Sequence, residues 1–523
     1  MNDYDRVAYP SMAHPQTFAE NLAIKGFLRG LDVAPPDRCR VLELGCGDGF
    51  NLATMAVIHP DAHYTGIDYS ADSIERGRKI LTGLNLSQVR LEAADIRALP
   101  AEFGEFDYII AHGVYSWVPS DVRDALLAVI SRNLAPHGVA FVSYLALPGA
   151  YMRETVRSIV RFHTRAVTDP KGKVLQARAV LQTVTRATAE PNIYSQWLTA
   201  ELDLIEKHTD EGFFHDELSE ISAPVLFTEF LDHAAKHRLQ FFSEAEYLLP
   251  VGRFLTEEAR TRLRPLEANR VLLEQYLDFI EGRRFRQTLL CKPGLGTSLA
   301  TERLDTLHIH LRAKPATATT NITGDEPTDY HGEKKAILRA KTPAEKAALL
   351  VLSSTNGRTL SYAQLITAVQ RRAAEAGVVL GDGYEPALRK FIIHSGVPGL
   401  IDFSWGRPAY ATTTPQRPQA NPLVHWMLAQ NSPQLANLTG QFVEIDDPLG
   451  RFLLSRLDGT RDHAALLTDI RAFLAQAHAT AKAEGQPPPA LPQPDAPTLS
   501  AQLTNSLQGL TQLGFFFATL PPA

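Results

Sequence analysis

The stretch Val-Leu-Glu-Leu-Gly-Cys-Gly-Asp-Gly, residues 41–49, decides the fold. It has the pattern of a buried strand that runs into three alternating glycines, and an apolar helical segment follows from residue 50. Glycines allow a tight turn and let a ligand approach the backbone closely. Because cofactors of the nucleotide type bind at the carboxyl ends of parallel strands, the stretch predicts a cofactor pocket at the end of this strand.

The same glycines could belong to a dinucleotide fingerprint, G-x-G-x-x-G/A, but their spacing argues against it. With Gly45 and Gly47 as the first two glycines, the third position falls on Phe50, whose bulk would obstruct the helix–sheet contact of that motif. Glu43 would repel a pyrophosphate, whereas it can accept a hydrogen bond from the ammonium group of S-adenosylmethionine (SAM). SAM is therefore the predicted cofactor.

Two further acids follow the next predicted strands. Asp68 ends the second strand, where its oxygens can accept from both ribose hydroxyls, and Asp95 follows the third strand, where it can accept from the adenine amino group. Either acid alone could be a solvated turn residue, but three acids at three successive strand ends favour SAM. The predicted cofactor-binding residues are Tyr9, Glu43, Gly45, Cys46, Gly47, Asp68, Tyr69, Ala94, Asp95, Ile96 and His112.

The chain predicts an α/β fold: a class I methyltransferase, Rossmann-like, seven-stranded sheet with a helical insertion, plus C-terminal winged-helix-like α+β domains. Five strands are expected at 40–44, 63–68, 89–93, 106–111 and 139–144, with helices between them. Long helices follow, and then two more strands at 239–247 and 285–291. We infer that the core resumes near residue 225 and closes near 293. A separate α+β domain over 149–295 is the alternative.

Six regions are expected along the 523 residues. They are a SAM-binding core (1–148), a helical insertion with a possible dimerisation role (149–225), the remainder of the core (226–295), a linker (296–340), a winged-helix-like domain (341–415) and a C-terminal winged-helix-like domain (416–523). The linker is inferred from the Thr-, Ala-, Pro- and Asp-rich segment 313–332. The Pro-rich stretch at 486–497 is expected to be mobile.

The methyl acceptor should lie beside the segment that follows the fourth strand, residues 111–119. Its aromatic side chains suit the approach of a cationic or newly deprotonated amine. Tyr115 and Trp117 are the candidate catalytic residues, and His112 could contact the cofactor or relay a proton. A structural His112 bonded to the backbone is the competing interpretation. The Asn/Asp-Pro-Pro-Tyr signature of amide and adenine N-methyltransferases does not occur in this segment.

Composition narrows the classes of partner. The formal net charge is −6, which disfavours binding to bulk nucleic acid. Three cysteines without paired spacing predict neither a disulfide framework nor a metal site and fit a reducing cytoplasm. No apolar run reaches the roughly 20 residues of a membrane span. The aromatic, Pro-rich segment 4–15 could fold over the cofactor as a lid or be a disordered tail.

Several stretches together resemble a known family. They are Tyr-x-x-x-x-Tyr-Pro-Ser at 4–11, the Glu43–Gly49 motif, His-Gly-Val-Tyr-Ser-Trp-Val-Pro at 112–119, Phe-His-Asp-Glu-Leu at 214–218 and Phe-Arg-Gln-Thr-Leu-Leu-Cys at 285–291. The chain resembles bacterial class I methyltransferases with a methyltransferase regulatory domain, whose best-known members methylate lysines of outer-membrane proteins. The resemblance implies a lysine acceptor on a protein substrate, a homodimer, and accessory domains that present the substrate. The last hundred residues also resemble small peptide-binding winged-helix modules.

One stretch departs from the family pattern. Leu-Ala-Leu-Pro-Gly-Ala at 145–150 stands where the family has Asn-x-Tyr-Pro-Gly-Trp, beside the expected acceptor pocket. Two other functions therefore stay open: a small-molecule N- or O-methyltransferase with a closed pocket, and a SAM-binding scaffold without turnover.

Overall fold

The computed structural model describes most of the chain. The described residues are 6–187, 190–248, 255–317, 321–332, 336–355, 358–397, 399–406, 409–483 and 495–518. Most of the Pro-rich stretch at 486–497 lies outside them, as does Tyr4 of the N-terminal motif. Among the described residues, no helix is long and apolar enough to cross a membrane.

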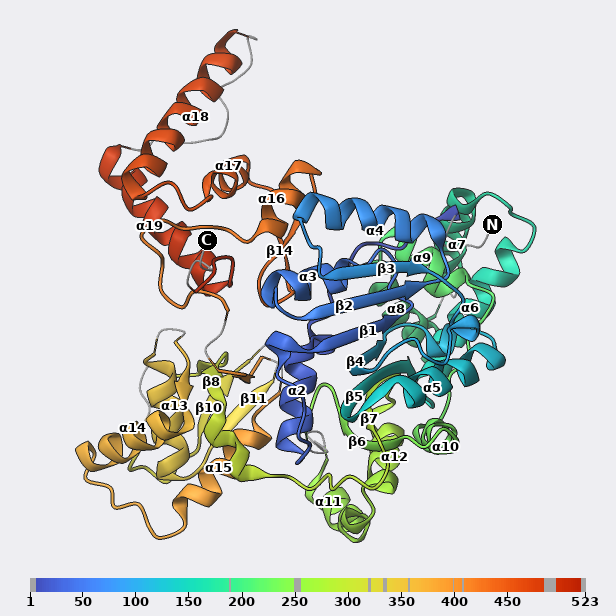
Figure 1. The fold of residues 1–523 in the computed structure, drawn as a ribbon, viewed down its shortest axis with the longest axis horizontal. Helices are drawn as coiled ribbons and strands as arrows, with labels where there is room; N and C mark the ends of the chain where they lie inside the picture. Colours follow the sequence, from blue (N-terminus) through green and yellow to red (C-terminus); the bar gives the residue numbers. More distant parts are fainter. Residues whose placement is uncertain are drawn as a thin grey trace.

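Seven strands form the central sheet, as the sequence predicts (Figure 1). In spatial order they are β3 (Val89–Ala93), β2 (His63–Asp68), β1 (Arg40–Leu44), β4 (Phe106–Ala111), β5 (Leu134–Leu145), β7 (Phe285–Cys291) and β6 (Gln240–Glu244). The first five are parallel, and β7 is antiparallel to both β5 and β6. The alternative of a separate α+β domain over 149–295 is therefore wrong, because β6 and β7 complete this sheet.

Helices cover both faces of the sheet, since alternate strand residues point to opposite sides. One face packs against α2 (Ala19–Leu28), α3 (Phe50–Ile58) and α4 (Ala71–Leu84). The other packs against α5 (Ser120–Asn133) and α10 (Phe227–Lys236), with α12 (Arg270–Glu281) beside α10. Val41 and Phe141 lie on the first face, and Leu42 and Val142 on the second.

A helical insertion separates β5 from α10. It consists of α6 (Ala150–Thr164), α7 (Pro170–Arg186), α8 (Ile193–Ile205) and α9 (Asp210–Leu218). These helices have an apolar cluster of their own, which includes Val156, Val160, Leu181 and Phe213. The insertion therefore has its own small core at the carboxyl side of β5. Between β6 and α12 come α11 (Glu257–Leu263) and the 3₁₀ helix η5 (Arg264–Ala268).

The segment 296–340, expected to be a linker, contains regular structure. It holds η6 (Thr301–Thr306), β8 (His308–Leu311), β9 (Lys314–Pro315), β10 (Thr328–His331) and β11 (Ile337–Ala340). The last three strands form an antiparallel sheet in the order β11-β10-β9. Tyr330 of β10 and Ile322, which precedes β10, are buried, so the segment 296–340 contributes to a hydrophobic core despite its polar composition.

The next region, 341–415, contains three helices followed by a strand. They are α13 (Pro343–Ser353), α14 (Tyr362–Glu375), α15 (Tyr384–His394) and β13 (Ile401–Ser404), and β12 (Leu360–Ser361) joins β8 and β13 in a second small sheet. A capping box between Thr342 and Glu345 begins α13.

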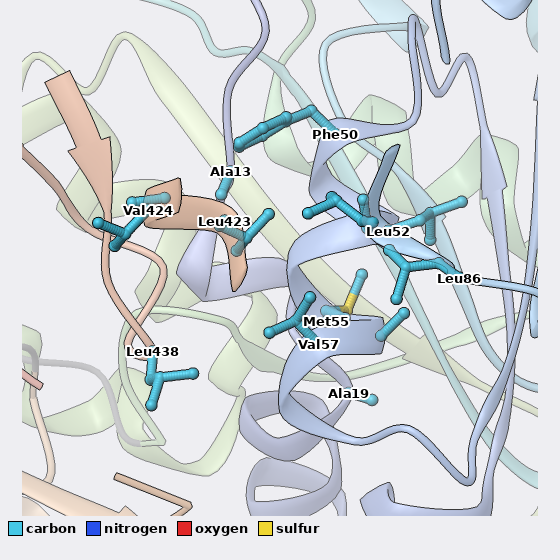
Figure 2. Close-up of a cluster of buried hydrophobic side chains, with 14 of the residues drawn as sticks. Ala13, Ala19, Phe50, Leu52, Met55, Val57, Leu86, Leu423, Val424 and Leu438 are labelled. Atoms are coloured by element: carbon cyan, nitrogen blue, oxygen red, sulfur yellow. The ribbon is translucent and has the colours of Figure 1, made fainter. Parts of the chain in front are cut away.

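The C-terminal region packs against the core. It contains α16 (Pro422–Ala429), β14 (Gln434–Ala436), β15 (Phe442–Glu444), α17 (Pro448–Arg456), α18 (His463–Ala483) and α19 (Ala496–Gln512). Figure 2 shows Leu423 of α16 facing α3, whose Phe50 and Met55 belong to the same apolar cluster as Leu423 and Val424. This region therefore shares one hydrophobic core with the α3/α4 face of the sheet.

A buried ionic cluster holds the returning strands in place. The Arg286 guanidinium, fully buried on β7, donates to Glu244 of β6 (2.8 Å) and to Glu274 (3.0 Å) and Asp278 (2.7 Å) of α12. Burial raises the pKa of Asp278 to about 6, although Arg286 opposes that shift. One cation thus links two strands and a helix.

Arg286→Met should destabilise the protein by about 3–5 kcal/mol, because it removes the cation that three buried carboxylates share, although Asp278 retains Arg283 (2.8 Å) and Glu274 retains the more distant Arg270 (4.0 Å). Chemical denaturation of the full chain measures this change in the free energy of unfolding. Arg260→Met, at an exposed position of α11, is the matched control and should change it by less than about 0.5 kcal/mol. Equal stability of the two variants would show that the cluster contributes nothing to the fold.

Candidate functional site

Three glycines with positive φ form the turn between β1 and α3. The φ angles are 76° at Gly45, 57° at Gly47 and 70° at Gly49, in the left-handed region that favours glycine. A Cβ atom at Gly45 would lie 2.4 Å from Val114, whereas one at Gly47 would meet nothing within 4 Å. The turn is therefore packed from behind at Gly45 and open in front of Gly47, where a ligand can reach the backbone.

Glu43 lies beneath this turn with its carboxylate buried. Its Oε1 accepts a hydrogen bond from Asn51 of α3 (2.9 Å), and its Oε2 has no partner among the described residues. Burial raises the pKa of Glu43 to about 8; the Asn51 hydrogen bond opposes the shift, and Asp48 and Asp68 add to it. A buried, unpartnered carboxylate oxygen is costly, and a cationic ligand group would satisfy it.

Asp68 stands at the end of β2, next to the same turn. Its Oδ2 accepts from the Gly47 N–H (2.8 Å) and its Oδ1 from the Ser70 N–H (2.8 Å). These two amides fix the orientation of the carboxylate, and burial raises its pKa. The structure therefore brings Glu43, Gly47 and Asp68 together at the carboxyl ends of two neighbouring strands.

Asp95 is also at this edge, but it already has a strong partner. It caps η3 (Ile96–Ala98), and its carboxylate forms hydrogen bonds with the Arg97 side chain, the shortest being 2.6 Å. This interaction lowers the pKa of Asp95. Its neighbour Ala94 donates its N–H to the Asp68 carbonyl (2.9 Å), so the β3 loop is tied to the end of β2. Ile96 packs partly buried against the α5 side of the core.

Two further predicted residues differ in exposure. Cys46 is buried beneath the glycine turn, where burial raises the pKa of its thiol, so its backbone and not its sulfur faces the open side. Tyr69, directly after Asp68, is 68% exposed, which leaves its ring free to cover a ligand.

The N-terminal segment lies across the glycine turn. The Ser11 hydroxyl donates to Asp48, and the His14 N–H donates to Asn51 Oδ1 (2.9 Å). Farther out, His215 of α9 interacts with the Val7 carbonyl (2.8 Å), and the Tyr9 ring lies 5.5 Å from the His215 ring. The segment therefore connects the turn to the helical insertion, with Tyr9 40% exposed between them.

His112 directly follows β4, on the same face of the sheet as Glu43. Its Nδ1 lies 2.9 Å from the Ser143 hydroxyl, which also accepts from the Gly113 N–H (2.8 Å). The rings of His14 and Phe285 lie 4.1 Å and 6.1 Å away. Burial holds the pKa of His112 well below its usual value, so the imidazole is neutral at physiological pH. It can accept a proton only transiently.

Trp117 sits against the first helix of the insertion. The guanidinium groups of Arg153 and Arg157, both on α6, lie 5.2 Å and 5.4 Å from its ring. Arg153 is in turn paired with Glu217 of α9 (2.8 Å). Trp117 thus joins the segment after β4 to the insertion, and its ring is already in contact with two cations.

Tyr115 is the predicted site residue that the structure does not bring to this group. Its ring is 2% exposed and packs edge-on against Phe230 of α10 and Tyr144 of β5, on the opposite face of the sheet from His112. Its hydroxyl contacts His233 Nδ1 (2.8 Å). The expectation that Tyr115 lines the acceptor pocket is corrected on this ground. The 3₁₀ turn η4 (Tyr115–Trp117) directs the Tyr115 side chain to the α5/α10 face, away from His112.

Sequence reasoning missed Asn51 and Ser143, which position Glu43 and His112. Asn51 carried a signal: it is a polar residue in the first turn of an otherwise apolar helix. Ser143 carried no such signal, because a serine within a buried strand is usually a small packing residue. The sheet order, the glycine turn and the acids at the strand ends define a class I methyltransferase.

Comparisons with known proteins agree with this class. Residues 36–190 match the model of a methyltransferase domain, 209–292 a predicted methyltransferase regulatory domain, and 416–515 the PKMT C-terminal winged helix domain. An uncharacterized protein of Rickettsia prowazekii is 35% identical over 45% of this chain and 94% of its own length. Another from the same organism is 28% identical over 93% of this chain and 88% of its own. The chain belongs to the class I methyltransferases that carry a methyltransferase regulatory domain.

A solved structure extends the likeness over the whole molecule. The structure of PKMT2 from Rickettsia typhi is 25% identical, covers 98% of this chain and all of its own, and superimposes with a TM-score of 0.81. The structure of the same protein in complex with AdoHcy shares the fold, with a TM-score of 0.79. The chain is thus a SAM-dependent methyltransferase with a C-terminal winged helix domain.

Asp68→Ala should weaken SAM binding by about 1–3 kcal/mol, because buried ligand hydroxyls lose a charged acceptor. Isothermal titration calorimetry measures the affinity. Asp72→Ala, which removes an exposed acid four residues along the chain, is the matched control and should bind normally. If Asp68→Ala binds SAM as tightly as the control, Asp68 is not part of the cofactor site.

SAM binding should release protons at neutral pH. Free Glu43, with a pKa of about 8, is mostly protonated at pH 7, and it must ionise to face a cation. Affinity should therefore increase as the pH rises towards about 8. Calorimetry at pH 7 in buffers with different ionisation enthalpies should show close to one proton released per SAM bound. Glu43→Gln should release none, and wild-type protein that released none would place the cation elsewhere.

Proposed function

We propose that this methyltransferase transfers the methyl group to the side-chain nitrogen of lysines in a protein substrate. The observation that carries this proposal is the whole-chain likeness to PKMT2, which includes the C-terminal domains. The sequence motifs that resemble protein-lysine methyltransferases point to the same acceptor. The small-molecule methyltransferases among the relatives cover much less of the chain: trans-aconitate 2-methyltransferase of Methylobacterium nodulans, for example, aligns over 38% of it.

Within the site, we propose that Glu43, Gly45, Cys46, Gly47 and Asp68 hold the amino-acid and ribose parts of SAM. The unpartnered oxygen of Glu43 fits the cationic part, and the open space at Gly47 fits close approach to the backbone. Ala94, Asp95 and Ile96 would bind the adenine. Tyr9, Tyr69 and His112 would close the pocket. Bound SAM supplies a methyl group on a positively charged sulfur.

Exposed aromatic rings support an acceptor site at the same edge of the sheet. Tyr9, Tyr151 at the start of α6 and Phe285 at the start of β7 keep 40%, 61% and 36% of their surface accessible. Phe285 pairs with the last residue of β5 and lies beside His112. Such faces can contact the chain of a lysine and attract its charged end. Trp117 would support the wall formed by α6.

The accepting amine must lose a proton, because the pKa of a free lysine is near 10.4. A desolvated site next to a cation lowers that pKa. His112, whose Nδ1 lies 2.9 Å from the Ser143 hydroxyl, would pass the proton to water. The methylation rate should therefore rise with pH through the neutral range.

Full-length protein incubated with labelled SAM and a lysate of the native host should label proteins. Mass spectrometry should find the added methyl groups on lysine side chains. Asp68→Ala should label far less at limiting SAM, and Asp72→Ala should label like wild type. Label confined to a small metabolite would replace the lysine assignment by a small-molecule N- or O-methyltransferase. No transfer to any acceptor, with SAM still bound, would indicate a scaffold without turnover.

Three further expectations remain proposals. The division at residues 148, 225, 295, 340 and 415 is one, although the segment 296–340 would then be a small structured module. A homodimer is the second, supported by the exposed apolar side chains along one side of α12: Leu272, Tyr276, Phe279 and Ile280. A cytoplasmic location is the third, supported by three cysteines that are free thiols.

A further inference from the structure

A compact group of metal-binding side chains lies on the α5/α10 side of the core, away from the cofactor pocket. His233 lies in the last turn of α10, His237 is the C-cap residue directly after that helix, and Asp124 comes from α5. One ligand atom from each lies within 4.8 Å of the others. Asp124 Oδ1 is 2.8 Å from His237 Nε2 and 3.3 Å from His233 Nε2.

These distances suit a shared metal ion. Histidines four residues apart on a helix present both imidazoles on one face, the spacing used by zinc sites. Zinc bonds to nitrogen and oxygen are roughly 2.0–2.2 Å long, so tetrahedral ligand atoms are about 3.3 Å apart. The distance from His233 Nε2 to Asp124 Oδ1 (3.3 Å) equals that separation, and the distance from His237 Nε2 (2.8 Å) would have to lengthen by about 0.5 Å around an ion. Two imidazoles and one carboxylate form a ligand set that zinc commonly takes in proteins.

The rest of the site is prepared for a ligand. His233 Nδ1 contacts the buried Tyr115 hydroxyl (2.8 Å), which fixes the ring so that Nε2 faces Asp124. Such an outer partner is a regular feature of metal-binding histidines. The side chain of Asp124 is 64% exposed, and those of His233 and His237 are 22% and 16% exposed. Solvent therefore has access on one side, where a water molecule can complete the coordination.

We propose that Asp124, His233 and His237 bind one Zn²⁺ ion that joins α5 to α10. The ion would connect the helix after the 112–119 segment to the first helix of the resumed core. Through Tyr115, it would also hold that segment in place. The sequence interpretation contained no metal site, because Asp124 is 109 residues from His233. The ion would stabilise the packing of α5 against α10, and this role does not depend on the identity of the methyl acceptor.

Zinc binding to the full chain tests the proposal. Protein stripped with EDTA and desalted should bind one Zn²⁺ per chain by calorimetry and by elemental analysis. Co²⁺ in its place should give the visible absorption of a low-coordinate site. Asp124→Asn, at an exposed position, and His237→Ala should each weaken Zn²⁺ binding by at least about tenfold, since even an outer partner contributes that much. Zn²⁺ should raise the melting temperature of wild type but not of Asp124→Asn.

Two controls separate this site from other effects. His163→Ala removes an exposed histidine of α6 and should bind Zn²⁺ as wild type does. Tyr115→Phe should weaken binding less than Asp124→Asn, because it removes an orienting contact and no ligand. Failure of the full chain to bind stoichiometric Zn²⁺ would overturn the proposal. So would Asp124→Asn and His237→Ala with wild-type affinity, which would leave the three groups as an ion pair alone.

Discussion

The pairing of β7 with β5 is the constraint on which the rest of the architecture depends. The chain leaves the sheet after β5, forms the four helices of the insertion and returns with β6 and β7. Strand β7 then pairs antiparallel with residues Ala140–Leu145 of β5. Closing so long a loop costs conformational entropy, which apolar burial and the Arg286 cluster offset. Because Arg286 contacts β6 and α12 at once, it also fixes the strand order β5-β7-β6. Phe285 is placed beside His112 as a result.

At the edge of the sheet that forms the cofactor pocket, buried acids destabilise the free protein and favour ligand binding. Glu43, Asp48 and Asp68 gather around one glycine turn. Burial raises the pKa of all three carboxyl groups, and Asp48 and Asp68 raise the pKa of Glu43 further. Backbone amides, Asn51 and Ser11 satisfy most of their oxygens, but one oxygen of Glu43 has no partner among the described residues. Perturbed acids of this kind concentrate at functional sites, where a ligand completes their interactions.

The sequence predicted what local patterns control. The strands β1–β4 and β7 and helix α3 begin and end where periodicity and glycines place them, and the acids at the strand ends follow from that sheet. It could not predict β9–β11, because strands of two to four residues carry too few apolar positions; Tyr330 is buried there within a polar run. Nor could it place Tyr115, since the η4 turn sends Tyr115 and Trp117 to different sides. The contact of Asp124 with His233 depends on tertiary packing alone.

The appended parts of the molecule act on different sides of the site. The C-terminal region docks on the outer surface of α3 and α4, where Trp426 packs against Gly83 and Phe50, so it supports the helix that begins at the glycine turn. The insertion instead borders the opposite side: its Arg153 contacts Trp117, its His215 contacts Val7, and its Glu201 pairs with Arg284. The insertion and the N-terminal segment therefore border the edge of the sheet where we propose that the acceptor binds. Changes in the insertion should therefore alter the choice of acceptor, whereas changes in α16 should alter the rigidity of the cofactor turn.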